Sequence, residues 1–149
     1  MGYNITIGVL PGTSVDALPL AADVLSFDEA SSFGSPSAAA QVGEHAVVVD
    51  TDFGEVTKQL AGALGSTAYI VMFGSTADMY VLQTVGAAER LRVEAAGEVV
   101  ENKGDPLPAE AALASADFPE DRHLALLEAL LGEPFEAIWQ AGFRPLAVS

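Results

Sequence analysis

Short runs of apolar residues, either alternating with polar ones or continuous, predict most of the secondary structure as strands. Residues 3–10 alternate and are typical of a strand with one buried face. Residues 45–50 hold a continuous run of alanine and valine, which is typical of a strand buried on both faces. Four later runs, separated by turn residues, predict an antiparallel meander. These four runs cover residues 67–73, 79–85, 89–94 and 98–101.

The third strand of this meander has a strict alternation of charged and apolar residues. Leu91 and Val93 fall on one face of the predicted strand, and Arg90 and Arg92 fall on the other. We expect the charged face to lie in water, because antiparallel sheets commonly bury one face and solvate the other.

Helical spacing and capping residues predict four helices. The first follows a cap at Thr13 or Ser14 and reaches Leu25; Pro19 either kinks this helix or marks its start. The second extends from Asp52, paired with Glu55 in a capping-box pattern, to Leu64. The third covers 120–131 and the fourth begins at Pro134. Apolar positions expected to face inward are Leu124, Leu127, Leu130 and Leu131 in the third helix and Phe135, Ile138 and Trp139 in the fourth.

Two segments carry few signals of regular structure. Residues 26–43 are rich in Ser, Ala and Gly and predict a long surface loop or a short helix with mobile flanks. Residues 102–119 form a proline-rich connection with a possible short helix, and residues 143–148 predict a final edge strand. The order of elements predicts a single α+β domain over residues 1–149. Its sheet is mixed and mostly antiparallel, and its helices pack largely on one face.

The charge balance excludes several classes of function. The chain has 149 residues, and 6 Lys and Arg against 21 Asp and Glu give a net charge of −15. A protein that neutralises nucleic-acid phosphates needs a basic face, so we expect no nucleic-acid binding and no adhesion to anionic membranes. The absence of cysteine excludes disulfides and thiolate chemistry. We predict a protein partner, attracted by the acidic surface if it is basic.

Targeting signals are also absent from the sequence pattern. The N-terminal segment lacks a basic region before its apolar run, so a cytoplasmic location is expected. The uncharged stretch between Lys58 and Asp78 contains several glycines and changes its pattern midway. We therefore interpret it as the end of a helix followed by a strand.

Part of the chain is similar to a known group of proteins. The segment Glu89-Arg90-Leu91-Arg92-Val93, the later Gly104-Asp105-Pro106-Leu107-Pro108-Ala109-Glu110 and the acidic Leu-rich helix resemble small uncharacterised acidic α+β proteins of high-GC, actinomycete-type bacteria. The resemblance covers roughly residues 44–149. It implies a fold and no activity.

One motif suggests catalysis. Asp50-Thr51-Asp52 follows a buried strand, and haloacid-dehalogenase-like phosphatases present two carboxylates around Mg²⁺ in this way. The second half of that pattern is missing: Gly54 replaces the expected Thr or Val, and no downstream acidic element completes the site. The alternative is that Asp50 ends the strand and Asp52 caps the following helix. Histidine chemistry is not supported, because His45 and His123 lie outside any recognisable pattern, with His123 beside the wet face of its helix.

These observations leave a non-catalytic protein that binds another protein, as an antagonist of a basic toxin or nuclease or as an assembly component. No catalytic residue and no cofactor is predicted. The candidate interaction residues are Asp117, Glu120, Asp121 and Glu128 on and before the third helix. A Mg²⁺-dependent phosphohydrolase that uses Asp50 and Asp52 is one alternative. A DNA mimic that blocks a DNA-binding enzyme is another, although the sequence has no long acidic run.

Overall fold

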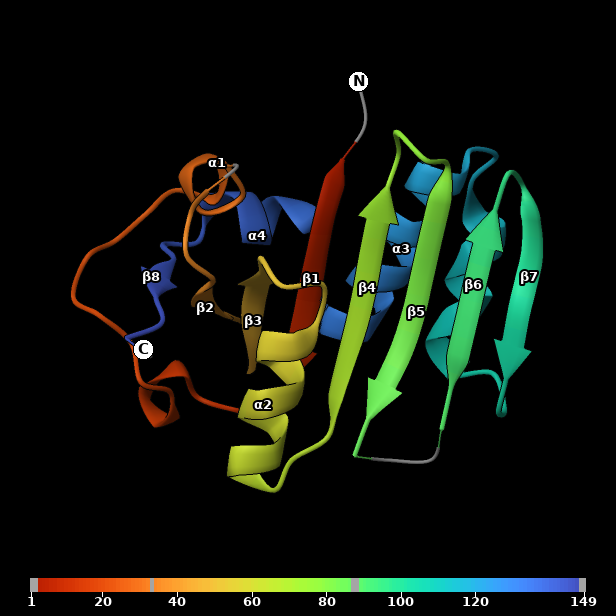
Figure 1. Cartoon of the computed structure of the whole chain (residues 1–149). Coiled ribbons are helices and arrows are strands. Elements are labelled where there is room, and N and C mark those ends of the chain that lie inside the picture. The colour runs from red at the N-terminus through yellow and green to blue at the C-terminus, as the bar shows by residue number, and fades with distance from the viewer. Residues whose placement is uncertain (1–2, 33, 87–88, 148–149) are drawn as a thin grey trace.

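The computed structural model describes residues 3–32, 34–86 and 89–147, and its centre is one antiparallel sheet (Figure 1). The strands are β1 (Asn4–Leu10), β2 (Ala38–Val42), β3 (His45–Asp50), β4 (Ala68–Gly74), β5 (Met79–Val85), β6 (Leu91–Ala95), β7 (Glu98–Lys103) and β8 (Arg144–Pro145). Their order across the sheet is β7-β6-β5-β4-β1-β3-β2-β8. The α+β class and the four-strand meander β4 to β7 are confirmed. Pairing among the described strands is antiparallel throughout, so the expected parallel component is not found there.

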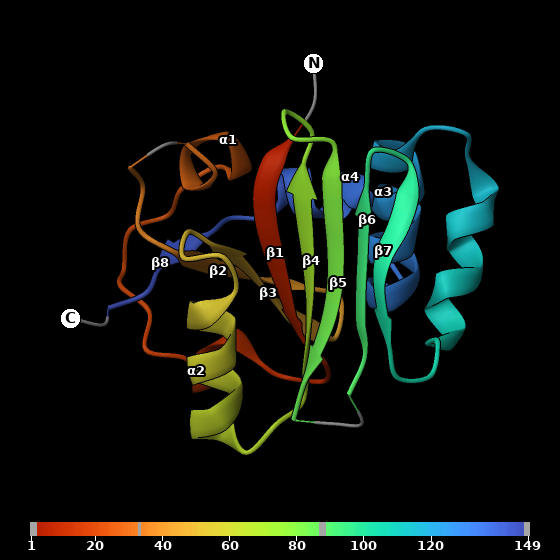
Figure 2. The same ribbon diagram turned by 45° about the vertical axis from the view of Figure 1, so that its right-hand side comes forward.

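Helices cover the sheet unequally. The α-helices are α1 (Phe27–Ala30), α2 (Glu55–Leu64), α3 (Pro119–Leu131) and α4 (Phe135–Gln140), and the 3-10 helices are η1 (Val15–Ala17) and η2 (Pro108–Ser115). Figures 1 and 2 show α3 and α4 behind the sheet and α2 in front of it. The prediction that helices lie largely on one face is confirmed; α2 lies on the opposite face, and Val15 of η1 packs into the same small core as α2.

The larger part of the core lies between the sheet and the helices behind it. Alternate residues of β1, β3 and β4, such as Ile7, Val49 and Phe73, pack there against Leu127 and Ile138 of the helices. A smaller core lies beneath α2, where Leu60 and Ala61 pack against the opposite face of β1, β3 and β4. The central strands are therefore apolar on both faces, as the continuous run in residues 46–49 predicts.

Two segments in the first third of the chain differ from their predictions in whole or in part. Residues 14–25 form only the short η1, and Leu20 and Leu25 instead make isolated bridges to Leu146 and Phe143. Pro19 and this pairing with the C-terminal segment override the weak helical pattern. For residues 26–43, the alternative of a short helix is confirmed by α1, which has a capping box between Ser26 and Glu29, but the buried strand β2 was not predicted.

The C-terminal half agrees better with its predictions. The helix at 120–131 is α3, the proline-rich connection contains η2, and the final edge strand is the two-residue β8 beside β2. Pro145 occupies the edge position that a residue without an N–H requires. The stretch between Lys58 and Asp78 is divided between α2 and β4, and no helix of the described residues is long and apolar enough to cross a membrane.

Candidate functional site

The candidate interaction residues on α3 do not form one free surface. Asp117 and Asp121 are exposed. Glu120, however, accepts hydrogen bonds from the Tyr3 N–H at 2.8 Å and from the Ser75 hydroxyl at 3.1 Å. Glu128 accepts from the Phe135 N–H at 2.7 Å and so fixes the start of α4. Two of the four carboxylates thus tie α3 to its neighbours, and two face solvent.

Asp50 ends β3, as the alternative interpretation predicts, but the predicted capping of α2 by Asp52 is wrong. Asp50 is 4% exposed, and its carboxylate accepts hydrogen bonds from the N–H of Asp52 and from the N–H and hydroxyl of Thr57. Asp52 is exposed and does not cap α2, whose N-cap is Gly54 with a φ of 96°. Asp50 therefore satisfies the free N–H at the start of the helix, from the end of the preceding strand.

Gly8 allows this contact between α2 and the sheet. A Cβ at Gly8 would lie 2.1 Å from the Thr57 hydroxyl oxygen, so only glycine lets Thr57 reach Asp50 across β1. No group of three or more His, Asp or Glu side chains within residues 3–32, 34–86 and 89–147 is placed to hold a metal ion. In the paired-carboxylate hypothesis, both oxygens of Asp50 already accept hydrogen bonds from the protein, and Asp52 is exposed.

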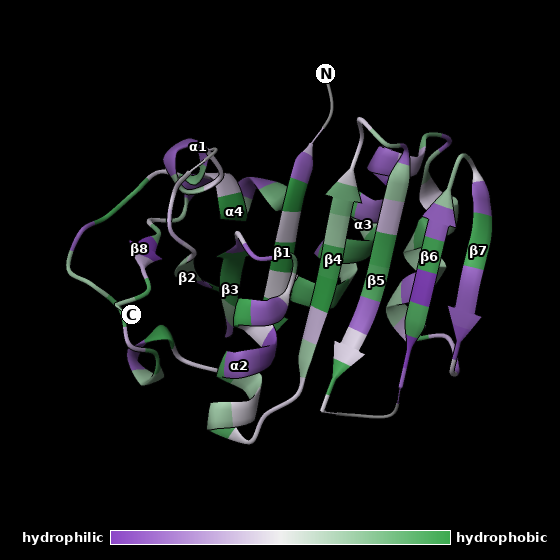
Figure 3. Ribbon diagram, in the orientation of Figure 1, coloured by the Kyte–Doolittle hydropathy of each residue, from purple (hydrophilic) through white to green (hydrophobic). Residues whose placement is uncertain are grey.

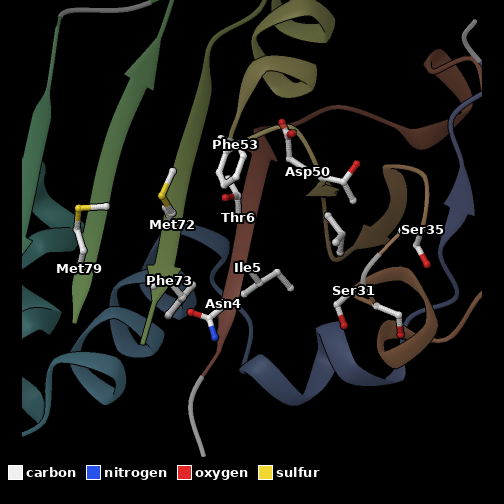
Figure 4. Close-up of a pocket in the computed structure, with 15 residues that line it drawn as sticks. Asn4, Ile5, Thr6, Ser31, Ser35, Asp50, Phe53, Met72, Phe73 and Met79 are labelled. Atoms are coloured by element: carbon white, nitrogen blue, oxygen red, sulfur yellow. The ribbon is translucent and has the colours of Figure 1, made fainter. Parts of the chain in front are cut away.

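A cleft of about 610 Å³ lies beside the end of β3 (Figure 4). Residues of β1, β4 and β5 form one wall, and the segment after α1 forms another. The wall is apolar at Ile5, Met72 and Met79 and carries hydroxyl groups at Thr6 and Ser31. Among the described residues that line it, Asp50 is the single charged one. Its Oδ1 accepts a hydrogen bond from the Asp52 N–H, and its Oδ2 accepts two from Thr57 of α2.

The charged face of β6 is buried, which overturns the expectation of a wet face. Arg90, directly before β6, is 2% exposed and forms a two-pronged ion pair with Glu110 of η2, at 2.8 Å and 2.6 Å. Its remaining donors reach the Asn102 side chain and the carbonyls of Lys103 and Gly104. This guanidinium fixes η2 against the end of β7.

Hydrogen bonding also sets the charge of Glu110. Burial alone would raise the pKa of this carboxyl, but the hydrogen bonds from Arg90 and from the Leu107 N–H, together with the charges of Arg90 and Arg92, lower it below its ordinary value. The segment Gly104–Glu110, which carries part of the resemblance noted above, therefore has a structural role: it binds the Arg90 guanidinium at both of its ends. Gly104 belongs to it because a Cβ there would lie 1.7 Å from the carbonyl oxygen of Glu89.

A second buried charge cluster lies between β6 and α3. Glu94 is 2% exposed and accepts hydrogen bonds from Arg92 at 3.2 Å and from Arg122 at 2.5 Å. His123, expected beside the wet face of its helix, is fully buried and stacks on Tyr80 with ring centroids 4.8 Å apart. Burial disfavours the imidazolium form and lowers the pKa of His123.

The tautomer of His123 follows from its partners. A carbonyl oxygen only accepts, so Nδ1–H donates to the Pro119 carbonyl at 2.7 Å. Nε2 is then the acceptor for the Arg92 guanidinium at 3.4 Å. Arg90, Arg92, Glu94 and His123 all lie on the side of β6 that the helices cover, so this polar interior belongs to the architecture.

The opposite face of the meander carries apolar residues outward. Directly opposed residues of antiparallel strands share a face, and the pairing therefore defines three rows across β4 to β7. The rows are Gly74–Met79–Ala95–Glu98, Met72–Val81–Val93–Glu101 and Ile70–Gln83–Leu91–Lys103. We call the partly exposed residues Met72, Met79, Val81, Leu91 and Val93 the meander patch.

The meander patch is uncovered and has a charged border. In Figure 1 the face of β4 to β7 opposite α3 is turned to the viewer, and α2 lies to one side of these strands. Figure 3 shows hydrophobic segments along β4 and β5 and hydrophilic ones at both ends of β7. The cleft shares Met72 and Met79 with the patch, so the two are continuous. Phe53, beside the cleft, is 74% exposed.

Acidic and basic side chains are distributed in opposite ways. Fifteen of the 21 acids are exposed, whereas Lys103 is the one exposed base among the described residues. The four arginines all bond inward, with Arg144 donating to the carbonyl of Ala21 at 2.8 Å. The charge exposed at the surface is therefore almost entirely negative, with fifteen acids against one base in the described part of the chain. Sequence reasoning missed this split, because it placed Arg90 and Arg92 in water.

Comparisons with known proteins add no family to this picture: the chain matches no protein family, no curated protein and no solved structure.

Proposed function

We propose that this chain is a non-catalytic module that binds a basic protein, as an antagonist or as an assembly component. The observation that supports this proposal is the different placement of acidic and basic side chains. Fifteen acids are exposed, whereas Arg90, Arg92 and Arg122 form ion pairs with the buried or partly buried Glu94 and Glu110. Such a surface draws positively charged partners over distances of about a Debye length and repels nucleic acid.

The alternatives have less support. A phosphohydrolase needs a carboxylate free to attack or to bind a cation, and the carboxylate of Asp50 already accepts three hydrogen bonds from α2 and its approach. A DNA mimic needs dense rows of carboxylates, about one charge per 1.7 Å of duplex. Two of the rows across the meander each end in a single acid, Glu98 or Glu101, and the residues before it in the row are uncharged. They therefore do not form a dense row of carboxylates.

A peptide-display selection tests the proposal directly, because it samples many partner sequences at once. The full chain is immobilised and exposed to a random peptide library at low and at high ionic strength, beside a neutral protein on the same support. We expect recovered peptides to be enriched in Lys and Arg and to bind less well at high ionic strength. Recovery of only neutral or acidic peptides, or of none beyond the control, would contradict the proposal.

A further inference from the structure

We propose that the meander patch is the surface on which the partner docks, and that the partner presents apolar side chains flanked by Lys or Arg. This inference rests on the proposed function and adds the location and the chemistry of the contact. The patch consists of Met72, Met79, Val81, Leu91 and Val93, and no helix of the described chain lies over it in Figures 1 and 2.

The first argument is the inverted polarity of β6. A strand of an antiparallel sheet with helices on one face ordinarily turns its apolar residues toward the helices and its charged residues to water. In β6 the arginine and glutamate side chains point to the helices, where they need ion pairs to be tolerated, and Leu91 and Val93 point outward. A shift of register by one residue would bury the apolar residues instead. The observed register therefore keeps an apolar face available.

The second argument is the continuity of this face across three strands. Val81 lies between Met72 and Val93 in one row, and Leu91 and Met79 lie in the rows on either side. Contiguous apolar surface of this kind marks interaction sites, whereas scattered exposed apolar residues need no explanation. Two methionines add side chains that adapt to different partner shapes.

The third argument identifies the occupant by its charge. Asp78, Glu98 and Glu101 border the patch at the β4–β5 turn and on β7, and all three are exposed. Lys103 is the one base at this border, and its ammonium lies 3.9 Å from Glu101. A second copy of the chain would bring the same acids and another net charge of −15 to the contact. A basic partner has the complementary charge.

The probe for this surface is a synthetic peptide of alternating Lys and Leu, with an alternating Lys and Ser peptide of the same charge as its control. Calorimetry measures their binding to the wild-type chain and to the double variant Val81→Thr/Val93→Thr. Thr is close to Val in shape and strand propensity, so the variant should fold. Val24→Thr is the matched control, because Val24 is 67% exposed and lies outside the meander.

We expect the Lys–Leu peptide to bind the wild-type chain more tightly than the Lys–Ser peptide. The Val81→Thr/Val93→Thr variant should lose roughly tenfold in affinity for the Lys–Leu peptide alone. The Val24→Thr variant should bind both peptides like the wild-type chain. Glu98→Gln/Glu101→Gln should weaken both peptides and reduce the salt dependence.

The other outcomes separate the two proposals. If both basic peptides bind but the patch variants change nothing, a basic partner still fits and the meander patch is the wrong surface. If neither basic peptide binds at low ionic strength, the proposed function is wrong and this inference falls with it. If the wild-type chain self-associates in sedimentation and Val81→Thr/Val93→Thr abolishes this, a second copy occupies the patch and the basic partner is excluded.

Discussion

A few buried polar residues decide where the elements of this fold begin. Asp50, at the end of β3, accepts the Thr57 N–H and hydroxyl at 2.8 Å each, and Gly8 supplies the space in which they meet. The carboxylate lies at the positive end of the α2 dipole, where a negative charge is stabilising. This contact fixes α2 to the sheet, and its cost of burial is offset by three hydrogen bonds.

The substitution Asp50→Asn tests this role. Asn keeps the shape of the side chain but loses the charge and one acceptor oxygen, so we expect the free energy of unfolding to fall by about 1–3 kcal/mol. Urea unfolding followed by circular dichroism measures the change. Asp52→Asn is the control, since Asp52 is exposed, and it should change stability by no more than about 0.5 kcal/mol. Equal effects of the two substitutions would contradict the assignment.

At the scale of the element, β6 shows what a pattern can and cannot predict. Strict alternation in residues 89–94 correctly predicts a strand, but periodicity does not state which face is buried. The faces are set by η2 and α3, whose Glu110 and Arg122 pair with Arg90 and Glu94. Those partners lie 20 and 28 residues away in the sequence, beyond the reach of a local pattern.

Other elements also differ in whether their local sequence is enough to predict them. β3 and β5 have the predicted bounds, because strongly apolar or alternating runs between turn residues decide them locally. β2 was missed because Ala38, Ala39 and Ala40 have low strand propensity, and pairing with Val47, Val48 and Val49 of β3 forms the strand. The sequence correctly predicts that Asp50 ends β3, but the contact with the start of α2 is made by Asp50 and not by Asp52.

The buried histidine between β6 and α3 predicts a pH dependence of stability. The folded chain lowers the pKa of His123, so the unfolded chain takes up a proton near pH 6.5 while the folded chain stays neutral. The contribution of neutral His123 to the free energy of unfolding is therefore fully present above about pH 6.5. It is lost as the pH decreases toward the lowered pKa, with a slope of up to about 1.4 kcal/mol per pH unit. Urea unfolding between about pH 5 and 7.5 measures this slope.

Two variants assign the slope to one histidine. His123→Gln cannot titrate in this range, so its stability, although lower, should vary less between about pH 5 and 7. His45→Gln removes the other histidine, whose ring accepts a hydrogen bond from the Gly12 N–H at 3.0 Å, and is the comparison for the loss of a histidine elsewhere in the chain. Equal slopes in the wild-type chain and in His123→Gln would contradict the prediction.

On the scale of the whole molecule, the excess of exposed acids has a cost for folding. Fifteen exposed carboxylates lie on one small protein with one exposed base in its described part, so the folded state brings like charges together. The unfolded chain separates them, and salt screens them with a Debye length of about 10 Å at 0.1 M. The same repulsion that a basic partner would relieve therefore lowers the stability of the free protein.

Sodium chloride should for this reason stabilise the folded state. We expect the urea midpoint to rise as NaCl increases from about 0.01 M to about 0.3 M, with a gain in unfolding free energy on the order of 1 kcal/mol. A variant in which exposed acids outside the meander are neutralised should be more stable at low salt and should respond less to salt. Its substitutions are Asp16→Asn, Asp23→Asn, Asp28→Asn and Glu44→Gln. A midpoint that is constant or falls with salt would show that the buried ion pairs outweigh the surface repulsion.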